Sequence, residues 1–171
     1  CLSTQASLLN SRAVKFWQSL GVTRVVPARE ATREDLKRIS KTGIEIETFI
    51  HGAMCTSISG KCILSNYVTN RDSNRGGCAQ ICRWEFASQD KPNFTIMPKD
   101  LNMVPFIKEE MGMGVKSFKI EGRMRSIYYI ATVILSYRKM IDAANNNTLT
   151  KSDEKYYLKV LNRCANREST P

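Results

Sequence analysis

Four of the six cysteines lie within one short segment, with the spacing Cys-x6-Cys-x15-Cys-x3-Cys: Cys55, Cys62, Cys78 and Cys82. Thiolates are the ligands of structural zinc and of iron–sulfur clusters, and the chain shows no secretory features that would favour a disulfide framework. The residues between the cysteines are rich in glycine, arginine and asparagine, which is typical of a loop folded around a bound group. The segment therefore predicts a metal or cluster site.

The spacing does not decide between zinc and a cluster. The second pair, separated by three residues, fits a zinc knuckle, whereas the first pair, separated by six, is wide for zinc. Iron–sulfur clusters accept wider and less regular spacings, although the Cys-x3-Cys-x2-Cys triplet of radical enzymes is absent. The spacing alone therefore leaves both zinc and an iron–sulfur cluster as possible bound groups. The remaining cysteines, Cys1 and Cys164, are expected to be bystanders.

The residues before the cysteine segment predict a strand with two chemically different faces. Alternation along residues 44–51 places the three isoleucines on one face and Glu45, Glu47, Phe49 and His51 on the other. In a βα barrel the isoleucines meet the helices, so Glu47 and His51 are expected to face the lumen at the active end of the strand. A hydrogen-bonded structural role is the alternative for the single histidine.

The other expected strands also end in polar or charged side chains. Their ends carry six candidate site residues: Gln5, Arg29, Glu30, Lys119, Glu121 and Arg123. Because the C-terminal ends of parallel strands meet at one edge of a sheet, we expect these side chains to converge with the polar face of residues 44–51. Local ion pairs, Arg29 with Glu30 and Lys119 with Glu121, are the alternative.

Helix and strand signals alternate along the chain. Strands are predicted at residues 2–6, 22–30, 44–51 and 115–121. Helices are predicted from Asn10 or Ser11 to Gly21, from the capping box Thr32-x-x-Asp35 to Gly43, within 98–114, from Ser126 to 145–147, and at 152–164. The expected buried faces are Ala13, Phe16, Trp17 and Leu20 on the first helix, and Ile127, Ile130, Ala131, Ile134 and Leu135 on the helix after Ser126.

This alternation predicts an α/β protein with a parallel sheet. Its four βα units fit the later half of a (β/α) TIM-type barrel, a partial barrel with residues 52–97 as a cysteine-rich loop insertion. Residues 1–145 are expected to form this C-terminal barrel half, and 146–171 a terminal helix and tail. The first residues resemble a cut into a longer protein, so the N-terminal barrel half is an expected partner.

The composition narrows the class of partner. The chain has 171 residues, 42% of them hydrophobic, which is enough for one domain with a core. Its net charge of +10 is spread along the chain and favours a polyanionic partner such as RNA. No apolar run is long enough to predict a membrane span, and the free thiols fit a reducing cytoplasmic setting.

Three groups of motifs carry a resemblance to a known family. They are Glu47-x-Phe49-x-x-Gly52-Ala53-Met54-Cys55 with Ser59-Gly60-Lys61-Cys62, then Arg71-Asp72-x-Asn74-Arg75-Gly76-x-Cys78-x-x-x-Cys82-Arg83-Trp84, and Phe118-Lys119-Ile120-Glu121-Gly122-Arg123-Met124. In this order they resemble the collagenase-like peptidase family of unknown catalytic type. The resemblance implies a βα barrel, of which this chain matches only the later part. It also implies a 4Fe–4S cluster on the four clustered cysteines, with zinc as the alternative.

Within that family the motifs are most similar to prephenate-dependent tRNA uridine hydroxylases, which form 5-hydroxyuridine at the wobble position. A ribosomal RNA cytidine hydroxylase is a related alternative. The first hypothesis is therefore an RNA hydroxylase in which the basic surface holds RNA. The expected roles are proton handling by His51, Glu47, Glu121 and Glu30, and binding of a prephenate-type carboxylate co-substrate by Arg29, Arg123, Lys119 and Gln5.

Two other functions compete with hydroxylation. The family label names a peptidase, but a single histidine cannot supply a His-Glu-x-x-His zinc site, and no Gly-x-Ser-x-Gly elbow is present. A cysteine protease would pair His51 with Cys55, which is better explained as a metal ligand. A metal-binding subunit without catalysis is the third hypothesis, which the charged strand ends disfavour.

Overall fold

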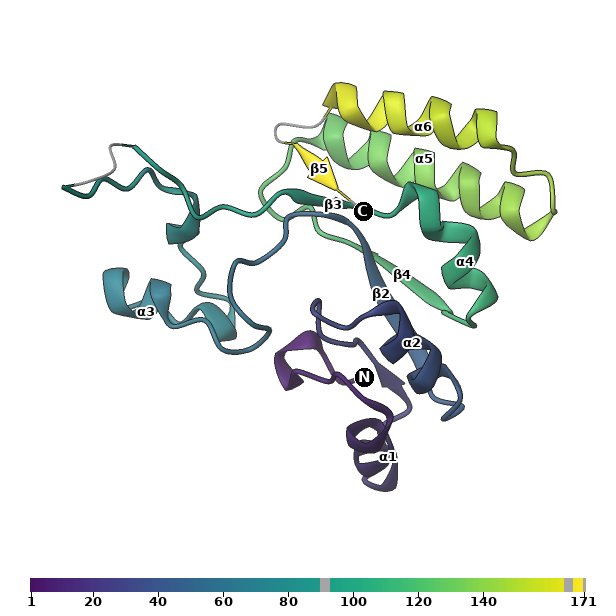
Figure 1. Ribbon diagram of the computed structural model, residues 1–171, viewed down its shortest axis with the longest axis horizontal. Helices are drawn as coiled ribbons and strands as arrows, with labels where there is room; N and C mark the ends of the chain where they lie inside the picture. The colour runs from purple at the N-terminus through teal and green to yellow at the C-terminus, as the bar shows by residue number, and fades with distance from the viewer. Residues whose placement is uncertain (90–92, 165–167, 171) are drawn as a thin grey trace.

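The computed structural model describes residues 1–89, 93–164 and 168–170, which fold into a mixed α/β structure (Figure 1). The sheet has five strands: β1 Arg24–Val25, β2 Glu45–Gly52, β3 Asp100–Asn102, β4 Ser117–Ile120 and β5 Ser169–Thr170. The helices are α1 Ser11–Ser19, α2 Arg33–Ser40, α3 Leu64–Thr69, α4 Ile107–Gly112, α5 Ile127–Asn145 and α6 Lys151–Cys164. Short 3-10 helices are η1 Thr4–Ala6, η2 Ser73–Arg75, η3 Ile81–Arg83 and η4 Val104–Phe106. None of the helices in these ranges is both long and apolar enough to cross a membrane.

The sheet is built around β2. Strands β1 and β4 both pair with β2 in parallel, and Leu2 extends the parallel order through a bridge to Val25. The short β3 pairs with the end of β2 in the antiparallel direction, and β5 runs parallel to β3. The predicted α/β class is confirmed, and the described strands form an open sheet that does not close into a barrel.

The strands are shorter than the sequence predicts. The strand expected at 22–30 is reduced to β1, and the one expected at 2–6 becomes the Leu2 bridge followed by η1. The antiparallel β3 lies within the stretch predicted as a broken helix, whose helical part is confirmed as η4 and α4. Because the strand ends leave the sheet early, their backbone is available to contact other segments.

Helix starts follow the predicted capping residues. Asn10 accepts a hydrogen bond from the Ala13 backbone N–H, and Thr32 forms a complete capping box with Asp35. The Ser126 side chain caps α5 in the same way, by accepting from the Tyr129 N–H. These local signals are confirmed because a cap depends only on residues within one turn.

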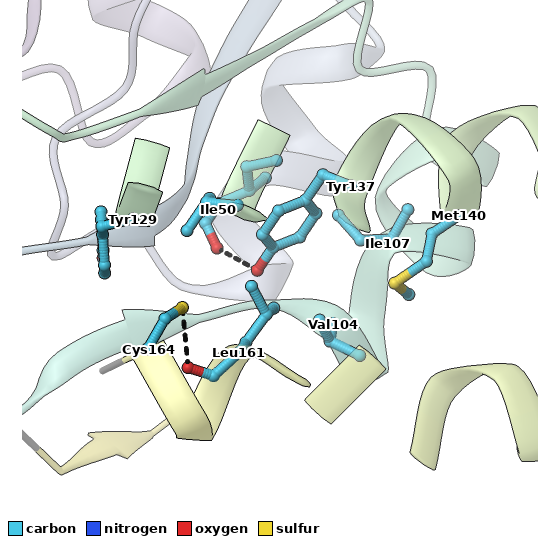
Figure 2. Packing of buried hydrophobic residues seen from close by; sticks show 9 residues of the cluster. Ile50, Val104, Ile107, Tyr129, Tyr137, Met140, Leu161 and Cys164 are labelled. Atoms are coloured by element: carbon cyan, nitrogen blue, oxygen red, sulfur yellow. Dashed lines mark hydrogen bonds between the residues drawn. The ribbon is translucent and has the colours of Figure 1, made fainter. Parts of the chain in front are cut away.

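The buried face of α5 differs from the prediction. Its buried side chains include Tyr129, Val133, Tyr137 and Met140, which pack with Ile50, Leu161 and Cys164 in one core cluster (Figure 2). The predicted face is wrong, because its members Ile127, Ile134 and Leu135 are exposed. The helix carries two apolar stripes at helical spacing, and the stripe that contains two tyrosines fills the space beneath β2. On α1 the correction is similar: Val14 is buried, whereas Phe16 and Leu20 are exposed.

His51 does not face the same side as Glu47, so this part of the prediction is wrong. The register between β2 and β4 shifts between Phe49 and His51, and such an irregularity reverses the alternation of side chains. His51 is only 4% exposed and its Nδ1 lies 3.3 Å from the Tyr137 hydroxyl oxygen. That hydroxyl donates to the Ile50 carbonyl at 2.8 Å (Figure 2). The histidine therefore belongs to the core beneath the sheet.

Burial of His51 predicts a loss of stability in mild acid. Its pKa is lowered from 6.5 to about 4, chiefly by burial; the charge of Asp100 opposes this shift and that of Arg125 adds to it. The unfolded chain therefore takes up this proton first, so the stabilisation is complete above pH 6.5 and is lost as the pH falls toward 4. Between pH 7 and 5 the wild type should lose about 2 kcal/mol more unfolding free energy than His51→Gln. Urea unfolding of both proteins at the two pH values measures this, and equal losses would contradict it.

Candidate functional site

The four clustered cysteines open onto one cavity of about 570 Å³. Cys55 and Cys78 are exposed, Cys62 and Cys82 are partly buried, and all four are free thiols. Burial raises the pKa of the Cys82 thiol, and the other three thiols are close enough to raise it further. The segment between β2 and β3 thus brings together the thiols that the sequence separates.

The donor chemistry of this cavity suits a thiolate-bound metal or cluster. Among the described residues, no three Cys, His, Asp or Glu side chains stand close enough together to hold an ion without moving. The backbone N–H of Gln80 donates to the Cys78 sulfur at 3.4 Å, the kind of contact that stabilises a thiolate ligand. The side chains are therefore of the type that would bind the predicted metal or cluster, and they line one cavity, but they do not stand close enough together to form a complete ligand set.

The predicted strand-end residues hold the cysteine segment in place. Gln5 Nε2 donates to the Asn74 carbonyl at 3.1 Å. The Ser59 backbone N–H donates to the Glu30 carboxylate, and the Ser59 hydroxyl accepts from the Arg29 backbone N–H at 3.3 Å. Two strand ends are thus tied to different parts of the cysteine segment.

The end of β4 supplies a third attachment. One oxygen of Glu121 accepts from the Ala53 N–H at 3.3 Å, and the other accepts from the Arg123 N–H at 3.1 Å. Arg123 Nη1 donates to the Gly76 carbonyl at 2.9 Å. Both carboxylate oxygens of Glu121 are therefore engaged by backbone donors, as expected of a group that anchors a loop.

Arg29 differs from these anchors because part of its side chain is uncommitted. Its guanidinium lies 4.7 Å from the centre of the Phe49 ring, and its Nε is buried with no hydrogen-bond partner among the described residues. Arg29 lines the cysteine cavity and also a neighbouring, mainly apolar cavity of about 510 Å³. In the wall of that second cavity Thr48 donates to the buried Glu110 at 2.6 Å, and burial raises the pKa of Glu110. No pattern in the sequence pointed to the pairing of Thr48 with Glu110.

Glu47 and Lys119 pair with each other on neighbouring strands. Lys119 Nζ lies 3.1 Å from Glu47 Oε1, and the same carboxylate contacts Ser117 and Arg24. Lys119 also lies 5.4 Å from the centre of the Phe49 ring. Neither residue lines the cysteine cavity. Lys119 therefore forms an ion pair, as the alternative to a shared site predicted, but its partner is Glu47 and not Glu121.

Convergence on one cavity is therefore partial. Eight predicted site residues line it: Gln5, Arg29, Glu121, Arg123 and the four clustered cysteines. Glu30 contacts the loop backbone, whereas Glu47, Lys119 and His51 lie elsewhere. The sequence reasoning missed Arg71, Arg83 and Trp84, which also line the cavity. The signal was present, since Arg83 and Trp84 directly follow Cys82.

Gly60 allows the cysteine segment to approach the N-terminal strand end. Its φ is +72°, and an added Cβ would lie 2.3 Å from the Gln5 carbonyl oxygen. We expect Gly60→Ala to lower the free energy of unfolding by about 2–3 kcal/mol, from both backbone strain and the clash. Gly76→Ala is the matched control, because its φ of +89° carries the same strain with no atom within 4 Å of the new Cβ. Urea unfolding compares the two variants, and equal effects would show that the close approach is unimportant.

Comparisons with known proteins show which sequences this chain resembles. The family described as Peptidase family U32 matches residues 1–171. The tRNA hydroxylation protein P1 of Bacillus subtilis is 46% identical over 183 residues, covering 98% of this chain and 43% of that protein. A protein named collagenase from Porphyromonas gingivalis is 38% identical, covering 86% of this chain and 40% of that protein. The 23S rRNA 5-hydroxycytidine C2501 synthase of Escherichia coli is 35% identical, covering 82% of this chain and 23% of that protein.

These matches extend over nearly the whole chain but not over the whole of its relatives. The chain spans less than half the length of each of these three proteins. No solved structure matches it significantly. The family match covers the cysteine segment and all the strand ends that hold it. The chain therefore belongs to peptidase family U32.

Proposed function

We propose that this chain is part of an RNA hydroxylase that acts on tRNA. The observation that carries the proposal is the meeting of four free thiols with Arg29 and Arg123 in one cavity at the strand ends. Thiols supply ligands for a redox group, and arginines supply positive charge for anionic substrates. The relatives named for tRNA and rRNA hydroxylation support the same chemistry.

In this proposal Cys55, Cys62, Cys78 and Cys82 hold a 4Fe–4S cluster, with zinc as the alternative. A bound cluster would supply single-electron chemistry at the cavity. The segment that carries the thiols is attached to three strand ends but is not packed into the main core, which would let it close around the group. A reducing, cytoplasmic setting would keep the thiols available as ligands.

Arg29 is the residue that we assign to the carboxylate of a prephenate-type co-substrate. Its unpartnered Nε and its place in both cavity walls leave it able to bind an anion, and a guanidinium binds carboxylates through two parallel hydrogen bonds. Arg123 is already committed in part to the Gly76 carbonyl. Glu121 and Glu30 serve chiefly as loop anchors, and no proton-transfer role is assigned to His51.

The finer parts of the proposal concern the substrate and the rest of the protein. The proposed product is 5-hydroxyuridine at the wobble position of tRNA. The parallel order Leu2, β1, β2, β4 supports a partial TIM-type barrel, which further polypeptide would complete. In this view residues 1–145 form the later barrel half and α6 is the terminal helix. The predicted tail is corrected in part, because Ser169–Thr170 form β5 beside β3, and residues 165–167 and 171 lie outside the described residues.

Nucleoside analysis tests the function. Mass spectrometry of tRNA from a strain lacking the gene should show loss of the hydroxylated uridine, restored by the wild-type gene. Unchanged tRNA in the deletion strain would contradict the proposal, and loss of a hydroxylated cytidine from ribosomal RNA would redirect it to that substrate. Iron analysis of anaerobically purified protein tests the cluster separately, since zinc without iron would exclude it.

Peptidase activity is the second candidate, favoured by the 38% identity to a protein named collagenase. The only histidine is buried beside Tyr137 and does not line the cavity of the thiols. No cysteine of the segment therefore has an imidazole positioned to activate it. Incubation of the protein with fluorescently labelled gelatin distinguishes the two functions. If the protein is a hydroxylase, gelatin cleavage should not exceed that in a blank without the protein.

A further inference from the structure

Trp84 stands at the cavity of the four thiols with much of its ring uncovered. It follows η3 directly, its backbone N–H donates to the Ile81 carbonyl at 3.0 Å, and its side chain is 48% exposed. It lines the same cavity as Cys82, two residues earlier in the chain. A tryptophan that is anchored through its backbone and half exposed beside a reactive site provides a flat surface for another ring.

The charges around this ring favour an anionic partner. Among the residues that the structure describes, four arginines line the cavity, Arg29, Arg71, Arg83 and Arg123, against one carboxylate, that of Glu121. Arg83, the residue before Trp84, donates through Nη1 to Gln80 Oε1 at 2.9 Å, which holds this guanidinium in place. An apolar protein partner would find an unfavourable rim of positive charge here, whereas a phosphate backbone would be attracted to it.

We propose that the cavity receives one unpaired nucleotide of an RNA loop, whose base stacks on Trp84 while the arginines hold its phosphates. This inference rests on the proposed RNA hydroxylase function and names the way in which that site takes its substrate. A ring can stack on a base only when the face of that base is free, so bases stacked in the interior of a duplex are excluded. The volume of about 570 Å³ lies within the usual range for a small-molecule site and gives room for one extruded base.

Binding measurements on the full-length protein test the inference. The probe is a fluorescein-labelled tRNA anticodon stem-loop, compared with a blunt RNA duplex of equal length. Trp84→Ala should raise the Kd for the stem-loop about 10-fold or more and leave the weak duplex binding unchanged. Trp84→Phe should restore most of the affinity, because it keeps an aromatic face. Arg71→Ala should reduce the salt dependence of binding by about 0.7 in the log–log slope.

Controls separate stacking from folding. Tyr156→Ala removes another exposed aromatic ring, on α6, and should bind the stem-loop like the wild type. Trp84→Leu keeps an apolar side chain without a flat ring, so it replaces Trp84→Ala if that variant does not fold. Wild-type affinity of Trp84→Leu or Trp84→Ala, in a protein that still hydroxylates tRNA, would overturn the stacking inference alone. Absence of both RNA binding and hydroxylation in the wild type would overturn the proposed function with it.

Discussion

Replacing Cys82 by serine should abolish both iron binding and RNA hydroxylation. Cys82 is partly buried and lines the cavity together with the other three cysteines, and its pKa is raised by burial and further by those cysteines. A serine hydroxyl is a poor ligand for iron at neutral pH, and loss of one thiolate leaves three ligands for a group that needs four. We expect hydroxylated tRNA to fall by at least about 100-fold in a complemented deletion strain.

The matched control for this change is Cys1→Ser. Cys1 is a free thiol like Cys82, but it is exposed and does not line the cavity. The Cys1→Ser variant should retain wild-type iron content and wild-type hydroxylation, measured by iron and sulfide assays and by nucleoside mass spectrometry. A Cys82→Ser protein that keeps its full iron content would contradict the four-cysteine assignment, whatever its activity.

Replacing Arg125 by alanine should have the largest effect on stability. Its guanidinium forms an ion pair with Asp100 in which the two side chains are only 8% and 6% exposed, and it lies 4.7 Å from the centre of the Tyr129 ring. Removal of the guanidinium takes its positive charge away from a buried carboxylate, which costs about 3–5 kcal/mol. Urea unfolding at neutral pH measures the loss.

Arg138→Ala gives the comparison for an exposed ion pair. Arg138 and Asp142 lie one turn apart on α5 and are both more than half exposed. Solvent screens such a pair, so its loss should change the free energy of unfolding by about 0.5 kcal/mol or less. An Arg125→Ala variant that is destabilised no more than Arg138→Ala would show that the buried pair contributes little to the fold.

Local parts of the fold were predictable from the sequence. The capping box of Thr32 and Asp35, the cap at Ser126 and the strand at 44–51 depend on neighbouring residues, so their patterns are complete within a few positions. The facing of His51 was not predictable, because the register irregularity after Phe49 arises from pairing with a strand nearly 70 residues later in the chain. Alternation assumes an unbroken ladder and fails at the first irregularity.

The sequence predicted which residues line the cavity better than it predicted what each of them does. Side chains at strand ends were expected to meet, and Gln5, Arg29, Glu121 and Arg123 do line one cavity with the cysteines. Residue type alone cannot say whether a polar group at a strand end will face a substrate or hold a loop, because either use requires hydrogen bonds. Glu121 could act chemically by its type, yet both of its oxygens already accept from backbone N–H groups.

The attachments of the cysteine segment have a consequence for how the family could diversify. Four of the loop groups that bind these residues are backbone groups: the carbonyls of Asn74 and Gly76 and the N–H groups of Ser59 and Ala53. The Ser59 hydroxyl, which accepts from the Arg29 N–H, is a side-chain exception. Bonds to backbone atoms hold whatever side chains the loop carries. The outer surface of the segment, α3 included, can therefore change in sequence while the thiols keep their position beside the sheet.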